Sequence, residues 1–535
     1  MPRPCSGAPA SLFTSVWHSV PRLFTIGDAA RRDTACTMGK STDRAASRHL
    51  EVERKFDVVE STVSPSFDGL SAVSRVERSP SHQLDAVYFD TPGRDLAARR
   101  VTLRRRTGGP DAGWHLKLPA GPDARTEVRE PLGDTDEGDV PEALRDVVLA
   151  IVRDRPLAPG ARISTSRTVD VLRAADGTPL AEFCDDQVTA QADPDGPEQQ
   201  WREWELELAA GGDRDLLDRL SNRLLDAGAE PAGHGSKLAR VLDTASDVEK
   251  PAPPDDPIHR AVAEQVEELL AWDRAVRADV YDSVHQMRVT TRKIRSLLQS
   301  SEDAFGISDD AWILDELRQL AAVLGVARDA EVLAERYERA LGELPKDLIR
   351  GPVWDRLVDG AKRQYVSGLR RSLIAMRSQR YFRLLDALEG LVATEPPPTQ
   401  PGEEDRGPTT LDSAYKKVRK AAKAAADVEA EAAHRDEALH RIRKGAKRLR
   451  YTAAATGADD VSARAKAIQS LLGDHQDSVV SRTHLSAHAE TAYAAGEDTF
   501  TYGLLYQLED ELARRSREQL KAALKKLDKS VRKEL

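Results

Sequence analysis

Residues 49–58 read HLEVERKFDV, and this stretch decides the fold prediction. Glu51, Glu53 and Lys55 stand two positions apart in it, with leucine, valine and phenylalanine at neighbouring positions. Because successive side chains of a β-strand point to opposite faces, the three charged groups would share one face of a strand. Both signs of charge on one face fit either a solvated sheet surface or a site that holds a cation and an anion together.

The same alternation recurs between residues 103 and 208, in segments separated by turn signals such as Asp-Thr-Pro-Gly at 90–93 and Gly-Gly-Pro at 108–110. One such segment is usually a half-solvated sheet face. The set favours a closed or strongly curved antiparallel sheet, because helices predicted near 141–153 and 213–227 can cover the apolar sides and leave the charged sides around a lumen. The charged residues on that inner face, besides the first three, are Arg104, Arg106, His115, Lys117, Glu127, Arg129, Arg167, Glu182, Asp186, Glu203, Glu205, Glu207 and Lys237.

A lumen with both kinds of charge is costly to enclose unless a charged ligand fills it. Arginine forks suit the paired oxygens of linked phosphates. Carboxylates suit Mg²⁺ or Mn²⁺, which takes oxygen ligands together with phosphate oxygens. We therefore expect phosphate binding by the cations Lys55, Arg104, Arg106, Lys117, Arg129, Arg167 and Lys237, and metal binding by the acids Glu51, Glu53, Glu205 and Glu207.

Residues 50–242 resemble a CYTH domain, the triphosphate tunnel metalloenzyme fold. The Glu51-x-Glu53-x-Lys55 motif carries the resemblance, followed in order by Tyr-Phe-Asp-Thr at 88–91, Leu-Arg-Arg-Arg at 103–106, Leu-Lys at 116–117, the glutamates at 203–207 and Ser-Lys at 236–237. The resemblance implies an eight-stranded antiparallel barrel that hydrolyses a triphosphate compound with a divalent metal, Glu51, Glu53 and Lys55 being catalytic. Inorganic triphosphate is a common substrate of such domains. In the segment at 180–188 we assign the metal ligand to Asp186, which keeps parity with Glu182.

The second half of the chain has a helical period. Residues 245–257, ASDVEKPAPPDDP, predict a linker, and residues 258–272, 281–298, 311–341 and 414–535 follow a period of 3.6, with a break at 393–410. The helical part repeats itself, because HQMRVTTRKIR at 285–295 matches HRIRKGAKRLR at 440–450, and Leu-Gly at 324–325 is answered by Leu-Gly at 472–473.

Each repeat places its cations on one helix face. Positions 0, 3, 7 and 10 of a helix fall within one arc, and the residues concerned are His285, Arg288, Arg292 and Arg295 in the first copy and His440, Arg443, Lys447 and Arg450 in the second. A lone charge run of this kind is usually a solvated face. The duplication favours two basic faces that meet in one groove for a polyanion, where repulsion would keep the histidines neutral.

Residues 258–535 resemble a CHAD domain, whose histidine-containing repeat implies binding of inorganic polyphosphate. Asp329 and Asp477 follow the second motif, where they either orient cations or cap helices. Nucleic acid is the weaker alternative, because the basic faces lack interleaved aromatic residues.

Composition limits the remaining classes. The chain has 535 residues, a net charge of −10 and three cysteines, so more than one domain, no generally basic surface and no disulfide framework are expected. No apolar run reaches the length of a membrane span. We expect a cytoplasmic protein, in part at polyphosphate granules. Residues 1–47 are expected to be a disordered extension, with Met38 as a candidate start that would leave the first 37 residues untranslated.

The combined expectation is an α+β protein of two domains. Residues 48–244 would form the eight-stranded antiparallel barrel with flanking helices and residues 258–535 a duplicated helical bundle. The alternatives are an enzyme acting on an organic or nucleoside triphosphate, such as thiamine triphosphate or ATP, and a scaffold that binds polyphosphate without catalysis.

Overall fold

The computed structural model describes residues 47–133, 138–192, 196–242, 256–300, 305–308, 311–393, 411–426 and 432–534. Residues Ala46–Leu535 belong to one compact unit. The predicted N-terminal extension, the alternative start at Met38 and most of the predicted linker lie outside the described residues.

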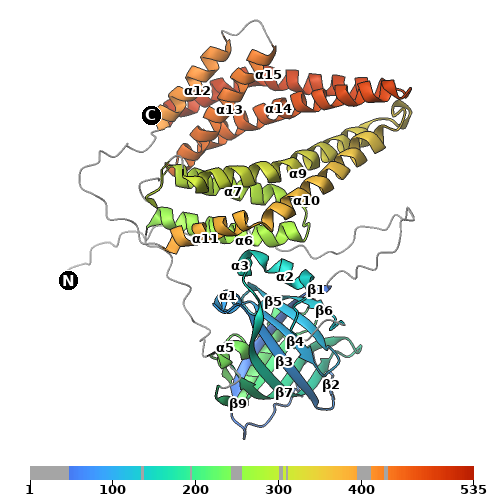
Figure 1. Cartoon of the computed structure of the whole chain (residues 1–535), viewed down its shortest axis with the longest axis vertical. Helices are drawn as coiled ribbons and strands as arrows, with labels where there is room; N and C mark the ends of the chain where they lie inside the picture. Colours follow the sequence, from blue (N-terminus) through green and yellow to red (C-terminus); the bar gives the residue numbers. More distant parts are fainter. Residues whose placement is uncertain are drawn as a thin grey trace, which may run out of the picture. The chain divides into compact units, whose positions relative to one another are not determined.

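Eight antiparallel strands close into a barrel (Figure 1). Their order around it is β1, β6, β5, β4, β3, β7, β8 and β9, and β9 pairs back with β1. The predicted eight-stranded antiparallel barrel is therefore confirmed. The strand bounds are β1 (Ser47–Val58), β3 (His82–Asp90), β4 (Thr102–Thr107), β5 (Gly113–Gly121), β6 (Ala124–Glu130), β7 (Ala158–Arg173), β8 (Pro179–Gln191) and β9 (Glu198–Leu208), and the short β2 (Arg75–Arg78) and β10 (Glu230–Pro231) add to β7 and β1.

Strand β1 closes the barrel because its two halves have different partners. Residues 47–52 pair with β6 and residues 53–58 pair with β9. The register sets Glu53 opposite Glu207 and Lys55 opposite Glu205. Directly paired residues of an antiparallel sheet point to the same face, so these four charges share the interior.

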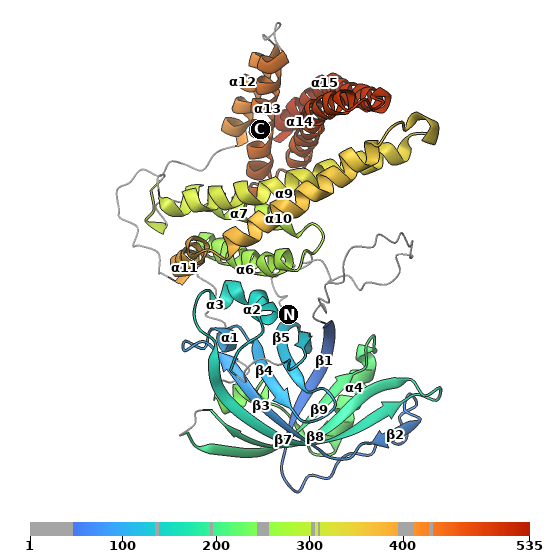
Figure 2. The ribbon, with the colours of Figure 1, turned by 45° about the vertical axis from the view of Figure 1, so that its right-hand side comes forward.

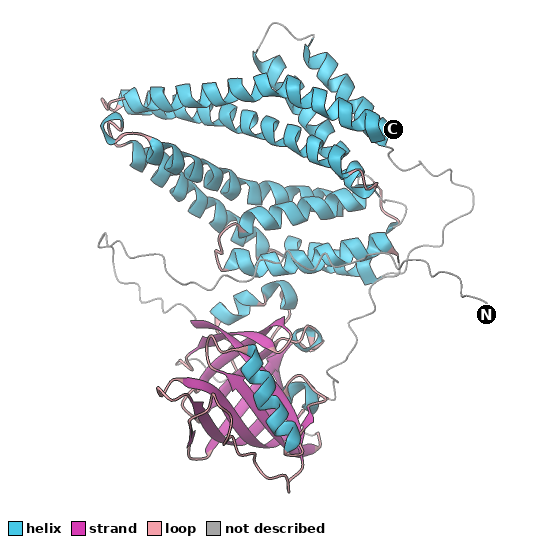
Figure 3. Cartoon of the chain, turned by 180° about the vertical axis from the view of Figure 1, so that it is seen from behind, coloured by secondary structure: helices cyan, strands magenta, loops and turns pink. Residues whose placement is uncertain are grey.

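The outward side chains of the same strands build an apolar layer under helix α4 (Arg214–Asp226). Trp204 and Leu206 of β9 pack there with Leu217 and Leu220 of the helix, which lies along the outside of the barrel (Figures 2 and 3). Asp213 caps this helix by accepting a hydrogen bond from the Asp215 backbone N–H. The alternation of β9 therefore separates apolar packing outside from glutamates inside. The other helices of this half are α1 (Asp95–Ala98), α2 (Glu142–Val147), α3 (Leu149–Val152) and α5 (Lys237–Val241).

The second half of the chain is helical and duplicated in its order of packing. Helices α6, α7, α9 and α10 pack each against the next, and α12, α13, α14 and α15 do the same. The α9–α10 and α14–α15 pairs form long hairpins (Figure 2). The bounds are α6 (Pro257–Arg277), α7 (Ser283–Ser300), α9 (Trp312–Glu343), η1 (Lys346–Leu348), η2 (Asp355–Asp359), α10 (Gly360–Met376), α11 (Gln379–Ala393), α12 (Leu411–Ala426), α13 (Ala432–Ala455), α14 (Asp459–Ala494) and α15 (Phe500–Glu534).

None of the helices in the described ranges has the length and apolar character that crossing a membrane requires.

Candidate functional site

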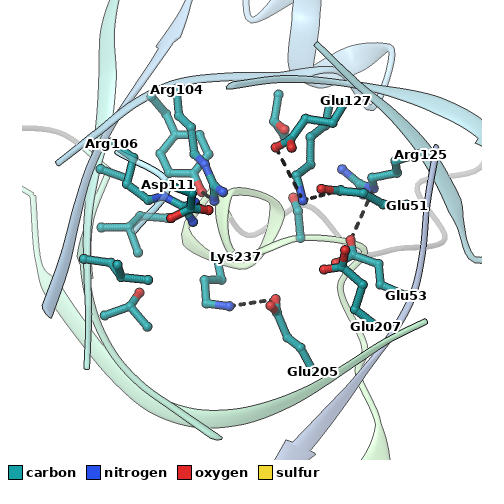
Figure 4. Close-up of a pocket in the computed structure, with 18 of the residues that line it drawn as sticks. Glu51, Glu53, Arg104, Arg106, Asp111, Arg125, Glu127, Glu205, Glu207 and Lys237 are labelled. Atoms are coloured by element: carbon teal, nitrogen blue, oxygen red, sulfur yellow. Dashed lines mark hydrogen bonds and ion pairs between the residues drawn. The ribbon is translucent and has the colours of Figure 1, made fainter. Parts of the chain in front are cut away.

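The barrel encloses a cavity lined mainly by charged side chains (Figure 4). Arg104 and Arg106 lie on one side of it, and Glu51, Glu53 and Glu207 lie on the other. The lumen therefore has an arginine side and a glutamate side. The predicted site residues that line it are Glu51, Glu53, Lys55, Arg104, Arg106, Lys117, Arg129, Arg167, Glu205, Glu207 and Lys237.

The arginine side of the lumen has hydrogen-bonding capacity to spare. The Nε atoms of Arg104 and Arg106 are buried and have no hydrogen-bond partner among the described residues. Arg104 Nη1 donates to the Tyr88 hydroxyl at 3.2 Å, and Arg106 pairs with Asp111. Burial, together with Arg104 and Arg167, lowers the pKa of Arg106 to about 9. A bound anion would stabilise the charge of Arg106 and would accept the unused N–H groups of both arginines.

The opposite side of the lumen has three carboxylates, and two of them are paired with lysines. Lys55 Nζ lies 3.2 Å from Glu53, and Lys117 Nζ lies 2.5 Å from Glu51. Glu207 has no ion pair within the described part of the chain. Burial and then Glu51 raise the pKa of Glu207 to about 7, although Lys117 opposes the rise. Burial would also raise the pKa of Glu53, but Lys55 and Lys117 outweigh it and lower that pKa to about 2.

Glu51 lies in one of the two groups of described residues that could hold a metal ion, together with His49 and Glu127. Glu51, Glu53 and Glu207 offer only oxygen atoms, and Glu207 lacks the compensating charge that a cation would supply. Burial and Glu51 raise the pKa of Glu207, and a bound cation would favour its charged form.

A second carboxylate group is already neutralised. Asp186, Glu203 and Glu205 can bring oxygen atoms within 4.8 Å of one another. Lys237 Nζ lies 2.7 Å from Asp186 and 2.8 Å from each of the two glutamates, and Arg167 forms a two-pronged contact with Asp186. An ammonium has three donors, so all three of Lys237 are used. Lys237 would have to leave a carboxylate in order to bind phosphate, and Asp186 is fully buried behind the residues that line the cavity.

Two histidines contact carboxylates at the edge of the first carboxylate group. His49 Nε2 lies 3.3 Å from Glu51 and 3.0 Å from Glu127. His115 Nδ1 lies 2.8 Å from Glu127, and burial lowers the pKa of His115 to about 4. His115 is therefore a neutral hydrogen-bond partner at physiological pH, and it helps to fix Glu127, which also pairs with Arg129.

In the helical half, the two predicted basic faces meet. Helix α7 carries Arg288 and Arg292, and α13 carries Arg443 and Lys447. Burial lowers the pKa of Arg292, and Arg288 and Arg443 lower it further. Burial and then Arg292 and Arg443 likewise lower the pKa of Lys447. Cations from different repeats are thus close enough to destabilise one another's charge.

The leading histidines of both motifs stand in this positive environment. The pKa of His285 is lowered by burial and Arg328, and that of His440 is lowered by burial and Lys444. His285 Nδ1 is buried and has no hydrogen-bond partner among the described residues. The remaining predicted residues of this site, Arg295 and Arg450, lie on the same two helices.

Two family models match the chain. The model for the CYTH domain matches residues 49–230, and the model for the CHAD domain matches residues 260–486. The chain belongs to the CYTH and CHAD families. It is 66% identical over 505 residues to an uncharacterized protein of Mycobacterium tuberculosis in strains CDC 1551 / Oshkosh and ATCC 25618 / H37Rv, an alignment that covers 91% of this chain and 98% of that protein.

Two solved structures are also similar to the chain. PptA from Streptomyces chartreusis is 19% identical with a TM-score of 0.42, covering 51% of this chain and 100% of that one. The CHAD domain from the plant Ricinus communis is 23% identical with a TM-score of 0.39, covering 50% of this chain and 90% of that one.

Sequence reasoning missed some residues of the CYTH lumen. Tyr88, Asp111 and Arg125 line the cavity. Strand parity could have found Arg125, which stands two positions before Glu127. Asp111 lies in the turn between β4 and β5, where alternation gives no signal.

In the CHAD half, the structure decides between the two interpretations of one predicted pair. Asp329 and Asp477 lie in the interiors of α9 and α14, so helix capping, one of the two explanations of these acids, is wrong. Burial raises the pKa of Asp477, while Arg336 and Arg443 oppose the rise. Asp477 is therefore close enough to a motif arginine to act on it electrostatically.

Proposed function

We propose that the CYTH barrel is a metal-dependent triphosphatase that hydrolyses inorganic triphosphate or a related short polyphosphate, and that the CHAD half binds inorganic polyphosphate. The observation that carries the proposal is the division of the lumen. Arginines with unused buried N–H groups face a carboxylate group in which Glu207 has no ion pair among the described residues. A phosphate chain bridged by a cation satisfies both sides at once.

The residues of the lumen divide the work. Glu51, Glu53 and Glu207 would hold Mg²⁺ or Mn²⁺, with Asp186 and Glu205 in the neighbouring group that Lys237 and Arg167 neutralise. The ion, when bound, supplies positive charge to phosphate oxygens and acidifies water. Arg104 and Arg106 would bind the phosphates and withdraw charge from the transferring group, so that most of the rate enhancement comes from positioning and electrostatics.

Lys55 has a structural as well as a catalytic place in this scheme. It lies between Glu53 and Glu205 and so joins the two carboxylate groups. Burial would lower its pKa, but Glu205 and Glu53 outweigh that effect and raise it, which keeps the ammonium charged. A fixed positive charge at this point would orient the acids and contact the phosphate chain.

An inorganic substrate is favoured over a nucleotide by the lining of the cavity. Among the residues that line it, Tyr88 alone is aromatic, and its hydroxyl is engaged by Arg104. A base or a thiamine ring would therefore find little stacking surface. An organic triphosphate remains the alternative that the substrate panel below tests.

The CHAD half would bind polyphosphate through the cations of α7 and α13. The supporting observation is that cations of both repeats lower one another's pKa, since a polyanion relieves this repulsion. We further propose that the protein works in the cytoplasm, at polyphosphate.

A phosphate-release panel tests the enzymatic proposal. The full chain is stripped of metal with a chelator and assayed with inorganic triphosphate, polyphosphate, ATP and thiamine triphosphate, each with and without Mg²⁺ or Mn²⁺. Metal-dependent release from inorganic triphosphate is expected, and it should be lost in Glu53→Gln but kept in Glu198→Gln, which changes an exposed glutamate of the same β9 strand that bears Glu207. Absence of turnover on all four substrates would favour the scaffold alternative.

A further inference from the structure

Two glycines occupy the same place in the two CHAD repeats. Gly325 lies within α9 and Gly473 within α14, each directly after a buried leucine. Neither has the left-handed backbone that favours glycine. Glycine in a helix interior costs about 1 kcal/mol relative to alanine. Backbone conformation therefore gives no reason for a glycine at either position.

Each glycine faces an arginine of the histidine-led segment in its own repeat. A Cβ atom on Gly325 would lie 3.3 Å from Arg288 Nε and 3.7 Å from Arg288 Nη2. A Cβ atom on Gly473 would lie 3.7 Å from Arg443 Nη2 and 3.9 Å from Arg443 Nε. The two arginines hold the same position in the duplicated motif, four residues into each copy. The same contact is thus built twice.

The contact fixes how the guanidinium lies. Arg288 Nε donates to the backbone oxygen of Ala321 at 3.1 Å, one turn before Gly325 on the same helix. Arg443 Nε is buried and has no hydrogen-bond partner among the described residues. The bare surface of each glycine lets the flat guanidinium rest on the neighbouring helix. No carboxylate pairs with either arginine in the described part of the chain, so the remaining N–H groups are available to a ligand.

We infer that Gly325 and Gly473 are positioning residues for polyphosphate, because each cradles the motif arginine and aims its N–H fork at the groove. The inference rests on the proposed binding of polyphosphate by the CHAD half. It adds that the Leu-Gly segment of each repeat positions the arginine of the histidine-led segment in the same repeat. Side chains at the two positions should move that arginine without breaking the helix.

The two repeats predict a graded response. At Gly325 the added methyl would be tighter than ordinary contact with Arg288, whereas at Gly473 it would make ordinary contact with Arg443. Gly325→Ala should therefore weaken polyphosphate binding about threefold, and Gly473→Ala should stay within about twofold of the wild type. A free-energy difference of about 1.4 kcal/mol corresponds to a tenfold change in Kd, so both expected losses are below that value. Leucine at either position should displace the arginine and raise the Kd about tenfold, the loss expected for one charge-assisted contact.

The experiment measures binding of inorganic polyphosphate of defined length to the full chain by isothermal titration calorimetry. Matched controls are Gly342→Leu in α9 and Gly503→Leu in α15, because a Cβ at either of these glycines meets no atom within 4 Å. The alanine variants and the two controls should melt at or above the wild-type temperature, since helix propensity improves, whereas leucine at the buried Gly325 should lose some stability through overpacking. Loss of affinity without loss of stability is a result that a merely structural role would not give.

Two further measurements identify the arginine as the cause. The slope of log Kd against log salt should fall for Gly325→Leu, because fewer cations meet phosphates. In an Arg288→Ala background the same leucine should cause no additional loss, as a double-mutant cycle would report. An equal loss in the controls, or full additivity with Arg288→Ala, overturns the inference. If the wild type binds polyphosphate and the glycine variants bind equally well, the positioning role alone is refuted; if the wild type does not bind, the proposed function of the groove fails with it.

Discussion

Replacing Glu207 with glutamine should stabilise the protein that lacks metal and weaken its response to metal. In the lumen this carboxylate has no ion pair among the described residues, and burial and Glu51 raise its pKa from the ordinary 4.5 to about 7. One pH unit of such a rise corresponds to about 1.4 kcal/mol, so charging Glu207 costs the folded state about 3 kcal/mol above pH 7. Glutamine has nearly the same shape and does not carry this charge.

The sign of the pH dependence follows from the raised pKa. Between pH 4.5 and about 7, folded Glu207 keeps a proton that the unfolded chain releases, so the stability of the metal-free wild type falls as the pH rises through this range. The variant does not share that fall. The difference in melting temperature between the variant and the wild type should be greatest at pH 8 and should shrink toward pH 5. It should reach several degrees, because about 1 kcal/mol shifts the melting temperature of a domain of this size by about 2–4 °C.

The assay is thermal unfolding of the full chain followed by circular dichroism, at pH 5.5 and pH 8, with chelator and with saturating Mg²⁺ or Mn²⁺. Metal should raise the transition of the wild type at pH 8, because a cation that binds only the folded state stabilises it. It should raise that of Glu207→Gln far less. Glu198→Gln serves as the control on β9. A metal-free variant that melts below the wild type at pH 8, or one that keeps the full metal response, would refute the reasoning.

Three other predictions follow from the same geometry. Glu53→Gln should leave the circular dichroism spectrum unchanged and eliminate metal-dependent phosphate release, and retained turnover would contradict the assignment. Polyphosphate affinity should rise as the pH falls from about 7 to 5.5, because the lowered pKa values of His285 and His440 leave neutral rings that take up protons from solvent more readily beside a bound anion. Calorimetry on the double alanine variant should show a flatter profile. Lys237→Met should lower the free energy of unfolding measured in urea by about 3–5 kcal/mol, because it leaves three buried carboxylates without their ammonium partner. A change near zero would show that the ammonium does not neutralise them.

Alternation predicted a closed or strongly curved sheet, and the resemblance to the CYTH family added the eight-stranded barrel; in such a sheet the parity of a residue decides whether it points inward or outward. The choice of Asp186 over Asp185 illustrates this. Asp186 is fully buried, whereas Asp185 points away from the lumen and pairs with Arg202. Parity gives the side of the sheet but not the partner, so it could not foresee that Asp186 would be taken by Arg167 and Lys237.

Some ion-pair partners of the lumen carboxylates come from elements other than the alternating strands. Lys237 comes from the short helix α5 and not from a strand, and the path of the chain after β10 brings it to the carboxylates. The sequence order of Ser236 and Lys237 gives no measure of that path. For the same reason the neutralised and the uncompensated carboxylates could not be told apart in the sequence, although this difference decides where a metal fits.

Helix boundaries in the second half were predicted less well than helix content. Residues 414–535 read as one helical region, but the described structure divides them among α12, α13, α14 and α15. Gly457 and Gly496 separate the last three of these helices, and both adopt positive φ values, 75° and 74°. Glycine after a helix is a termination signal because it accepts this left-handed conformation without a steric cost. The signal was present in the sequence, at the end of two alanine-rich runs.

The duplication explains why the second half can bind a polyanion at all. A single basic helix face would be solvated, and its cations would repel one another weakly through water. Two copies give cations that act on one another across the repeats: Arg443 lowers the pKa of Arg292, and Arg292 lowers the pKa of Lys447. That repulsion opposes folding and is relieved by a bound anion. Binding of polyphosphate should consequently stabilise the two repeats together, because part of the repulsion that it relieves acts between the repeats.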